Sequence, residues 1–219
     1  MAVSTFVPPR HGAHPDPNGN MITLLTRGLL QDGWIPQEDL RTVSFLEAVS
    51  RDVKGEFLGI ATTHEEMGSL VLASGALTCE EGIPSFSARI RYPFGITYER
   101  ILEILRKSAE EWGFELSSAV PGSKPYRNDL NSPFVKLLLE AYRSVVPSDK
   151  GPVVMSGGTY AHHLPNAYVF GMAGNQVPPD FPKGHGGAHG IDEVVSLPRL
   201  KRALKIYVRA LLALNEMDW

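Results

Sequence analysis

Histidines are the residues of this chain whose type and setting most suggest chemistry. The sequence has seven: His11, His14, His64, His162, His163, His185 and His189. Imidazole is the commonest metal ligand among side chains, and it exchanges protons near neutral pH. Two of the seven stand in the stretch GHGGAHGIDE at 184–193, where glycines would let a ring approach a ligand closely. Any one of them could equally be a surface histidine without a function. No H-E-x-x-H motif, which would mark a zinc site, occurs in the sequence.

Two further patterns could hold an anion. Arg91 ends the β-prone stretch RIRYP and precedes a turn at Pro93 and Gly95, so its guanidinium could bind a carboxylate through two hydrogen bonds. A surface arginine on an edge strand would give the same pattern. The two glycines of SGGTYA, at 156–161, expose backbone N–H groups that can bind an anionic oxygen, although a plain tight turn is equally compatible.

Composition narrows the class of protein. The 219 residues carry a formal net charge of -3 with no long basic block, which argues against a nucleic-acid partner. Cys79 is the only cysteine, so an internal disulfide and a cysteine-rich zinc site are both excluded. The N-terminal stretch lacks the order of a signal peptide, and no apolar run is long enough to span a bilayer. We therefore expect a cytoplasmic protein without a membrane partner.

The elements that must position these residues can be read from periodicity and turn signals. Helices are predicted over 21–33, 40–52 and 98–113, and an antiparallel hairpin over 68–93 with its turn at Glu81 and Gly82. A short strand is predicted at 114–120. This first half is therefore expected to be α+β, with helices on one face of a sheet.

Turn formers cluster at 121–133 and mark a domain boundary near residue 123. Beyond it, Ser132 and Pro133 should begin a helix, and strands are predicted at 151–156 and 166–172. A last helix follows, with apolar residues along one stripe: Leu197, Leu200, Leu204, Tyr207, Leu211 and Leu214. Its basic residues lie mostly off that stripe, which favours a solvated face over a membrane-binding one.

In this order the pieces resemble the C-terminal part of a PepV-type dipeptidase. Such enzymes belong to the zinc metallopeptidase family M-20, together with aminoacylases, carnosinases and succinyl-diaminopimelate desuccinylases. The matching stretches run across nearly the whole chain in the family's order: GAHPDPNGN, IRYP, SPFVKLLLEAY, SGGTYAHHLPNAYVFG and AHGIDEVVSL. The third of these belongs to the helix after Ser132, and the last contains one of the two glycine-flanked histidines.

When the family's site positions are matched to this sequence, the resemblance implies a zinc ligand at His189. It also implies that His14 stabilises the oxyanion formed at the scissile carbonyl. It implies that Arg91 binds the substrate carboxylate, and it leaves His185 as a bystander. It also implies further contacts to the peptide substrate from the lid motif and from a glycine loop: Asn20, Gly157, Gly158 and Thr159.

The chain departs from the family pattern at several positions. Asp192 stands where an asparagine is usual, His162 where an arginine follows the glycine loop, and Arg89 where an acidic residue is common. The intact family enzyme holds two zinc ions, and its other metal ligands and its general-base glutamate precede the lid. The pair Glu65 and Glu66 falls between lid motifs and is expected on a helix surface instead.

The sequence therefore predicts an α/β protein in two parts. Residues 1–123 would form a partial lid or dimerisation subdomain, with helices and an antiparallel sheet, and 124–219 the C-terminal α/β segment of a zinc-exopeptidase catalytic domain. The implied activity is hydrolysis of short peptides with zinc, absent from this chain alone and dependent on the missing N-terminal half of the catalytic domain. Self-association is a further possibility. Two alternatives stay open: a deacylase of N-acyl amino acids, and a non-catalytic association module built on the lid.

Overall fold

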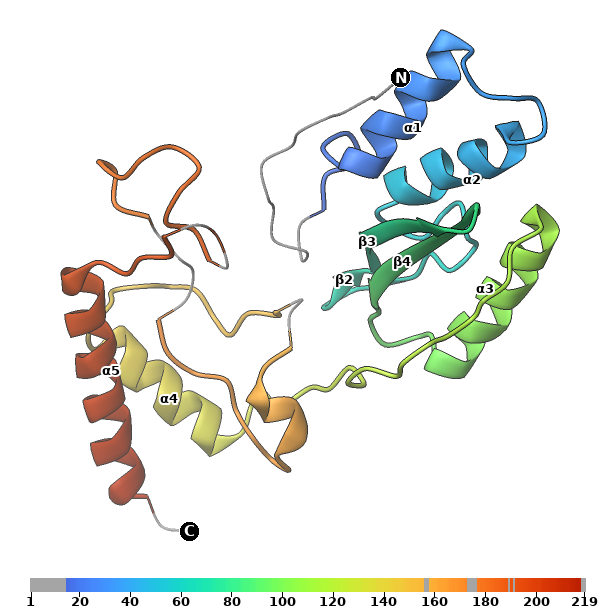
Figure 1. The fold of residues 1–219 in the computed structure, drawn as a ribbon. Helices are drawn as coiled ribbons and strands as arrows, with labels where there is room; N and C mark the ends of the chain where they lie inside the picture. Colours follow the sequence, from blue (N-terminus) through green and yellow to red (C-terminus); the bar gives the residue numbers. More distant parts are fainter. Residues whose placement is uncertain (1–14, 156–157, 173–176, 189, 191, 218–219) are drawn as a thin grey trace. The chain divides into compact units, whose positions relative to one another are not determined.

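The computed structural model describes residues 15–155, 158–172, 177–188, 190 and 192–217 (Figure 1). Within these ranges the fold is mixed α/β, and it combines helices with two small antiparallel sheets. The chain divides into two compact units, Met1–Pro125 (unit 1) and Tyr126–Trp219 (unit 2). The identification of these units with a lid and a catalytic segment stays a prediction.

The hairpin of unit 1 pairs β3 (Val71–Glu80) with β4 (Ile83–Arg91) in antiparallel register. The two turn residues, Glu81 and Gly82, have φ values of 51° and 82°. Positive φ at both central residues is what a two-residue hairpin turn of the favoured hand requires. The hairpin and its turn are therefore confirmed.

Three helices accompany the hairpin: α1 (Met21–Asp32), α2 (Leu40–Arg51) and α3 (Tyr98–Trp112). All three lie where the sequence places them, because their ends are specified locally. The Thr97 hydroxyl accepts a hydrogen bond from the Arg100 N–H at 3.2 Å and so caps the start of α3. Gly33 and Gly113 end α1 and α3 in the left-handed conformation.

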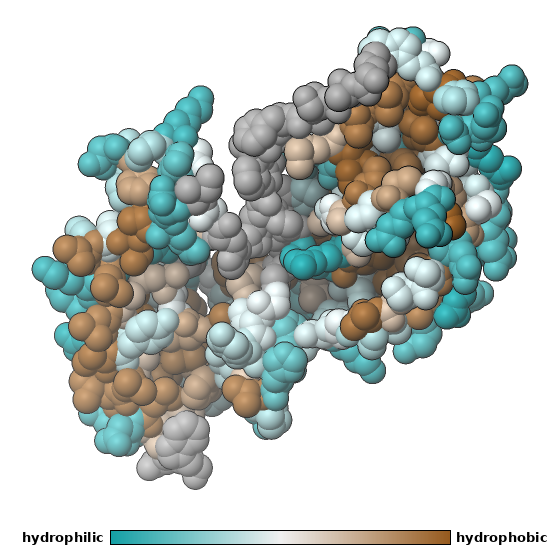
Figure 2. All heavy atoms as spheres, viewed as in Figure 1, coloured by the Kyte–Doolittle hydropathy of each residue, from teal (hydrophilic) through white to brown (hydrophobic). Residues whose placement is uncertain are grey.

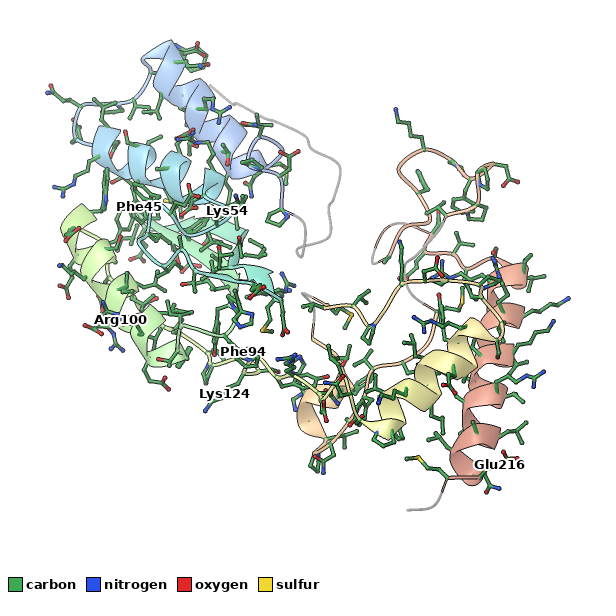
Figure 3. The ribbon with its side chains drawn as sticks, turned by 180° about the vertical axis from the view of Figure 1, so that it is seen from behind. Phe45, Lys54, Phe94, Arg100, Lys124 and Glu216 are labelled. Atoms are coloured by element: carbon green, nitrogen blue, oxygen red, sulfur yellow. The ribbon has the colours of Figure 1, made fainter. Side chains whose placement is uncertain are left out.

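A hydrophobic core joins α2 and α3 to the hairpin. It is built from these buried residues: Phe45, Leu46, Val49, Leu58, Ile60, Leu70, Leu72 and Ile101. Phe45 points from α2 into the interior of unit 1 (Figure 3), where its ring stacks on Phe114 with centroids 4.3 Å apart. The Oγ1 of Thr23 and the Oγ of Ser50 lie 2.8 Å apart and join α1 to α2.

The predicted strand at 114–120 is wrong, because the segment has no neighbouring strand among the described residues. A strand exists only where its backbone groups pair with a neighbour. The Phe114 N–H instead donates to the Ala109 carbonyl at 2.8 Å, and its ring closes the core. Phe114, which begins the apolar pattern of the predicted strand, instead follows the C-terminal end of α3 and packs against the core.

The expectation for Glu65 and Glu66 is also wrong, because they lie in a turn and not on a helix. This turn joins β1 (Thr63–His64) to β2 (Gly68–Ser69). The Nδ1 atom of His64 accepts hydrogen bonds from the N–H of Glu66 at 3.2 Å and from that of Met67 at 3.3 Å. The histidine therefore organises the turn that carries the acidic pair.

Unit 2 contains α4 (Pro133–Arg143), the short 3-10 helix η1 (Tyr160–His163) and α5 (Leu197–Asn215). Ser132 and Pro133 begin α4 as predicted, with the Ser132 hydroxyl accepting from the Val135 N–H at 3.2 Å. Helices α4 and α5 pack together over a small core whose buried members are Leu138, Ala141 and Ala210.

The two strands predicted in unit 2 are not formed among its described residues, 151–155 and 166–172. The apolar side chains of the first segment are exposed: Val153 is 75% exposed and Val154 is 52% exposed. In the second segment, Tyr168 and Phe170 are partly buried against the core between α4 and α5. An apolar, β-prone segment forms a strand only when another strand pairs with it, and the described part of the chain contains no such partner strand for either segment. No helix in the described ranges has the length and apolarity needed to cross a membrane.

Candidate functional site

Three of the seven residues that the resemblance assigns to a site lie outside the described residues: His14, Gly157 and His189. The other four are described and fall in different units. Asn20 and Arg91 belong to unit 1, and Gly158 and Thr159 to unit 2.

Asn20 is the N-cap of α1. Its Oδ1 accepts a hydrogen bond from the Ile22 N–H at 2.8 Å, and its backbone is extended, as a capping residue requires. The side-chain oxygen is thus engaged in starting the helix. Any contact of Asn20 to a substrate would fall to its amide nitrogen.

Arg91 is the last residue of β4 and lies opposite Val71, where the hairpin meets the rest of unit 1. Side chains alternate along a strand, so Arg89 and Arg91 share one face, while Ile90 packs with the core on the other. Arg91 is half-buried and Arg89 is exposed. Two guanidinium groups on one face near the end of a strand supply donors of the kind that bind a carboxylate.

The residues after Arg91 form a turn that joins β4 to α3. Burial, together with the nearby Glu99 carboxylate and the Tyr98 phenol, raises the pKa of Tyr92 above its usual value of 10.0. The following Pro93 is buried, and Gly95 has φ of 100°, a value that side-chain-bearing residues rarely adopt.

In unit 2, Thr159 begins η1. Its Oγ1 accepts a hydrogen bond from the Ala161 N–H at 3.3 Å. The ring of His162 lies edge-on to Tyr126 with centroids 4.8 Å apart, and a Cβ added to Gly158 would lie 3.7 Å from that ring. The His162 ring therefore lies beside Gly158, which is itself exposed. Tyr126 belongs to no motif, so sequence reasoning missed it.

Two contacts join the ends of the second glycine-rich loop. Nδ1 of His185 lies 3.1 Å from Oδ2 of Asp192, and the Val194 N–H donates to the Gly186 carbonyl at 3.2 Å. Gly186 has φ of 75°, and a Cβ there would lie 2.7 Å from the Phe181 ring. His185 thus has a structural partner that the sequence did not suggest. The loop so closed is the one that contains position 189.

A metal site is not assembled by the described residues alone. Among them, no group of three or more histidine, cysteine, aspartate or glutamate side chains converges as metal ligands would. A protein zinc site needs about three protein ligands. The residues described here therefore do not fit a zinc ion by themselves.

A hollow beside α3 is a second feature of the surface. It is lined by Gly59, Arg100, Glu103, Ile104 and Lys107, and Arg100 and Glu103 form an ion pair at 2.7 Å. Arg100 lies on the outward side of α3 (Figure 3). None of the residues assigned by resemblance lines this hollow, so it adds nothing to the candidate site.

Comparison with known proteins supports a dipeptidase-type function. The chain is 30% identical over 165 residues to a protein of Staphylococcus epidermidis named "Putative dipeptidase", a match that covers 75% of this chain and 34% of that protein. A protein of the same name from Staphylococcus aureus strain USA300 is 29% identical over 163 residues, covering 73% of this chain and 33% of its own length. The chain spans about a third of the length of these curated relatives. No family model matches the chain.

Proposed function

We propose that this chain is the C-terminal part of a zinc-dependent dipeptidase that hydrolyses short peptides. The observation that carries the proposal is the similarity, over about three quarters of the chain, to proteins named as putative dipeptidases, and the zinc dependence rests on the resemblance alone. Because the match spans only a third of those proteins, the proposal includes a second polypeptide segment that supplies the rest of the catalytic domain. The chain alone is then inactive.

The part of this chain in catalysis is to bind and orient the peptide. Arg91 is proposed to hold the free carboxylate, which fits its half-buried place at the end of β4, on the same face as Arg89. Gly158 and Thr159 are proposed to lie along the peptide's C-terminal end, where exposed backbone N–H groups can bind its oxygens. The proposed roles of His14, Gly157 and Asn20 rest on the resemblance alone.

Zinc is the cofactor that the resemblance implies, with His189 as this chain's ligand. Since the described residues do not fit the ion by themselves, we derive no catalytic step through it. The hydrogen bond between His185 and Asp192 supports a narrower statement: the loop that contains position 189 has a closed base. Closed loops hold a ligand more firmly than open ones, because less conformational entropy is lost on binding.

The first experiment uses the purified chain with a panel of dipeptides, with and without added zinc. We expect no hydrolysis in either case. Hydrolysis by the chain alone that His189→Ala abolishes would contradict the need for a second segment. N-acetyl amino acids in the same panel distinguish a deacylase from a dipeptidase.

The second experiment tests the activity itself. The matched part of this chain replaces the corresponding stretch of the S. epidermidis relative, and the folded chimaera is assayed for dipeptide hydrolysis. We expect activity that His189→Ala abolishes and that chelation of zinc removes. A folded chimaera that shows no hydrolysis, beside an active parent relative, would overturn the proposal.

A further inference from the structure

The hairpin of unit 1 carries two arginines side by side on the face turned away from the core. Side chains alternate along a strand, so Arg89 and Arg91 point to one side of β4, and Ile90 points to the other side, where it packs with the core. Two strand steps separate the Cα atoms of the arginines by about 7 Å, a distance that two long side chains can span. In Figure 2, hydrophilic side chains are seen over this part of unit 1. Both guanidinium groups can therefore contact one small ligand.

The hairpin residues that flank the two arginines supply no negative charge. The strand register places Val71 opposite Arg91 and Ala73 opposite Arg89, and directly opposite residues share a face of the sheet. The residue of β4 that precedes Arg89 on this face is Ser87, which is neutral. The hairpin is described throughout, and its acidic residues lie at its turn, the end remote from the arginines. An anion at this face therefore meets two positive charges and no competing carboxylate from the hairpin.

Arg89 is the arginine that is available to an added group. It is exposed, and across the described part of the chain it takes part in no ion pair or hydrogen bond. Binding a ligand through Arg89 therefore breaks no contact within the protein and displaces only water. Arg91 is half-buried at the end of the strand, so it is the more restricted of the two. Arg89 can thus adjust to a second anionic group on a ligand that Arg91 holds.

The identity of residue 89 changes the sign of the charge beside the proposed carboxylate site. Arg89 stands where an acidic residue is common among the proteins that the chain resembles. A carboxylate at this position would repel a second negative group on the ligand, whereas a guanidinium attracts it and can bind it through two hydrogen bonds. The substitution therefore favours ligands with two negative groups over ligands with one.

The covalent structure of a dipeptide indicates which of its side chains reaches Arg89. The terminal carboxylate, proposed to bind Arg91, belongs to the C-terminal residue. When that residue is aspartate or glutamate, its second carboxylate is only a few bonds from the first, which suits two arginines about 7 Å apart along a strand. The side chain of the N-terminal residue lies beyond the scissile bond and is further away. The second carboxylate is therefore that of the C-terminal side chain.

We propose that Arg89 binds the side-chain carboxylate of a C-terminal aspartate or glutamate while Arg91 binds the terminal carboxylate, so that the site prefers dipeptides ending in an acidic residue. The proposal rests on the proposed function, because it takes the carboxylate-binding role of Arg91 as its starting point. Arg89 sets the choice of substrate by binding and moves no proton in the reaction.

The test uses the full chain and three peptides in titrations followed by NMR: alanyl-glutamate, alanyl-glutamine and alanyl-glutamine amide. The first two have nearly the same shape and differ by one negative charge, and the third lacks the terminal carboxylate as well. We expect alanyl-glutamate to bind about fivefold more tightly than alanyl-glutamine, which is the effect of one exposed ion pair. This ratio should fall towards one as salt is added, because salt screens exposed charges.

Two variants that remove the same charge show whether Arg89 is the cause. Arg89→Gln should reduce the ratio of the two affinities to about one, and Arg89→Lys should keep part of it, because lysine retains the charge but not the paired hydrogen bonds. The matched control is Arg106→Gln, at an exposed arginine of α3, and it should keep the ratio of the parent. An unchanged ratio in Arg89→Gln would overturn the proposal.

The three peptides also separate this proposal from the one on which it rests. If the parent binds alanyl-glutamate and alanyl-glutamine equally, and the amide more weakly, then Arg89 does not select the substrate but the carboxylate site stands. If all three bind equally, the role of Arg91 fails and the role of Arg89 fails with it. Should the chain alone bind every peptide too weakly to measure, the ratio of kcat/KM for the first two peptides in the chimaera decides, with the same variants and the same expected ratios.

Discussion

Nδ1 of His185 lies 3.1 Å from Oδ2 of Asp192, and this contact joins the two ends of the loop that contains position 189. Asp192 adopts φ of 55°, a left-handed conformation that aspartate and asparagine tolerate better than most residues. The contact and the backbone conformation therefore depend on the same residue.

Asp192→Ala should open this loop, because it removes the hydrogen-bond acceptor and places alanine in a strained conformation. We expect the Val194 amide, which donates to the Gly186 carbonyl, to exchange its hydrogen about tenfold faster, equivalent to about 1.4 kcal/mol of local stability. Asp192→Asn should change the exchange rate much less. Equal protection in all three proteins would show that the contact does not hold the loop.

Asp52→Ala should destabilise unit 1 strongly. The Asp52 carboxylate accepts hydrogen bonds from four consecutive backbone N–H groups after α2, those of Lys54, Gly55, Glu56 and Phe57. Losing the acceptor leaves these donors with water alone, and we expect the free energy of unfolding to fall by about 2 kcal/mol in urea denaturation.

The control for Asp52 is at the other end of the same helix. Asp39 precedes α2 but makes no capping hydrogen bond through its side chain. Asp39→Ala should therefore change the free energy of unfolding by less than about 0.5 kcal/mol. Similar losses for the two variants would contradict the special role of Asp52.

The raised pKa of Tyr92 predicts a loss of stability at high pH. Below about pH 10 the phenol is protonated in both the folded and unfolded chain, so it has no effect on their balance. Above that pH the unfolded chain gives up the proton first, and stability falls as pH rises through the folded pKa. Tyr92→Phe should flatten this fall in melting temperature. Tyr160→Phe, a change at a residue 89% exposed, should leave it unchanged.

Arg91→Lys in the chimaera should raise the KM for dipeptides by about tenfold to a hundredfold, because a lysine cannot form the paired hydrogen bonds of a guanidinium. A dipeptide amide lacks the carboxylate, and its KM should hardly change. Arg106→Lys, the same change at an exposed arginine of α3, is the matched control. An equal effect of the two substitutions would indicate general charge rather than specific binding.

The helices and the hairpin were predictable because their signals are local. Ser132 with Pro133, Thr97 and the Glu81–Gly82 turn each act within a few residues of chain, so the sequence alone locates them. The strands proposed at 114–120, 151–156 and 166–172 depended on pairing with distant backbone. An apolar, β-prone segment says nothing about whether a partner strand exists.

Much of the candidate site was beyond the reach of periodicity. The roles of Arg91, Thr159 and the unplaced histidines came from the order of motifs, since a residue's contacts to a substrate leave no trace in spacing. The pair of His185 with Asp192 needed a left-handed residue seven positions on, and the contact of His162 with Tyr126 joins residues far apart in the sequence.

The two units differ in the size of their hydrophobic cores, and this difference affects how readily each is degraded by proteases. Unit 1 closes over a cluster of buried aromatic and aliphatic side chains, whereas the buried members of the cluster between α4 and α5 are Leu138, Ala141 and Ala210. A unit with a small hydrophobic core needs less free energy to open locally, and each opening exposes its backbone to proteases. Limited proteolysis of the chain should therefore begin in unit 2 and leave unit 1 as the longer-lived fragment.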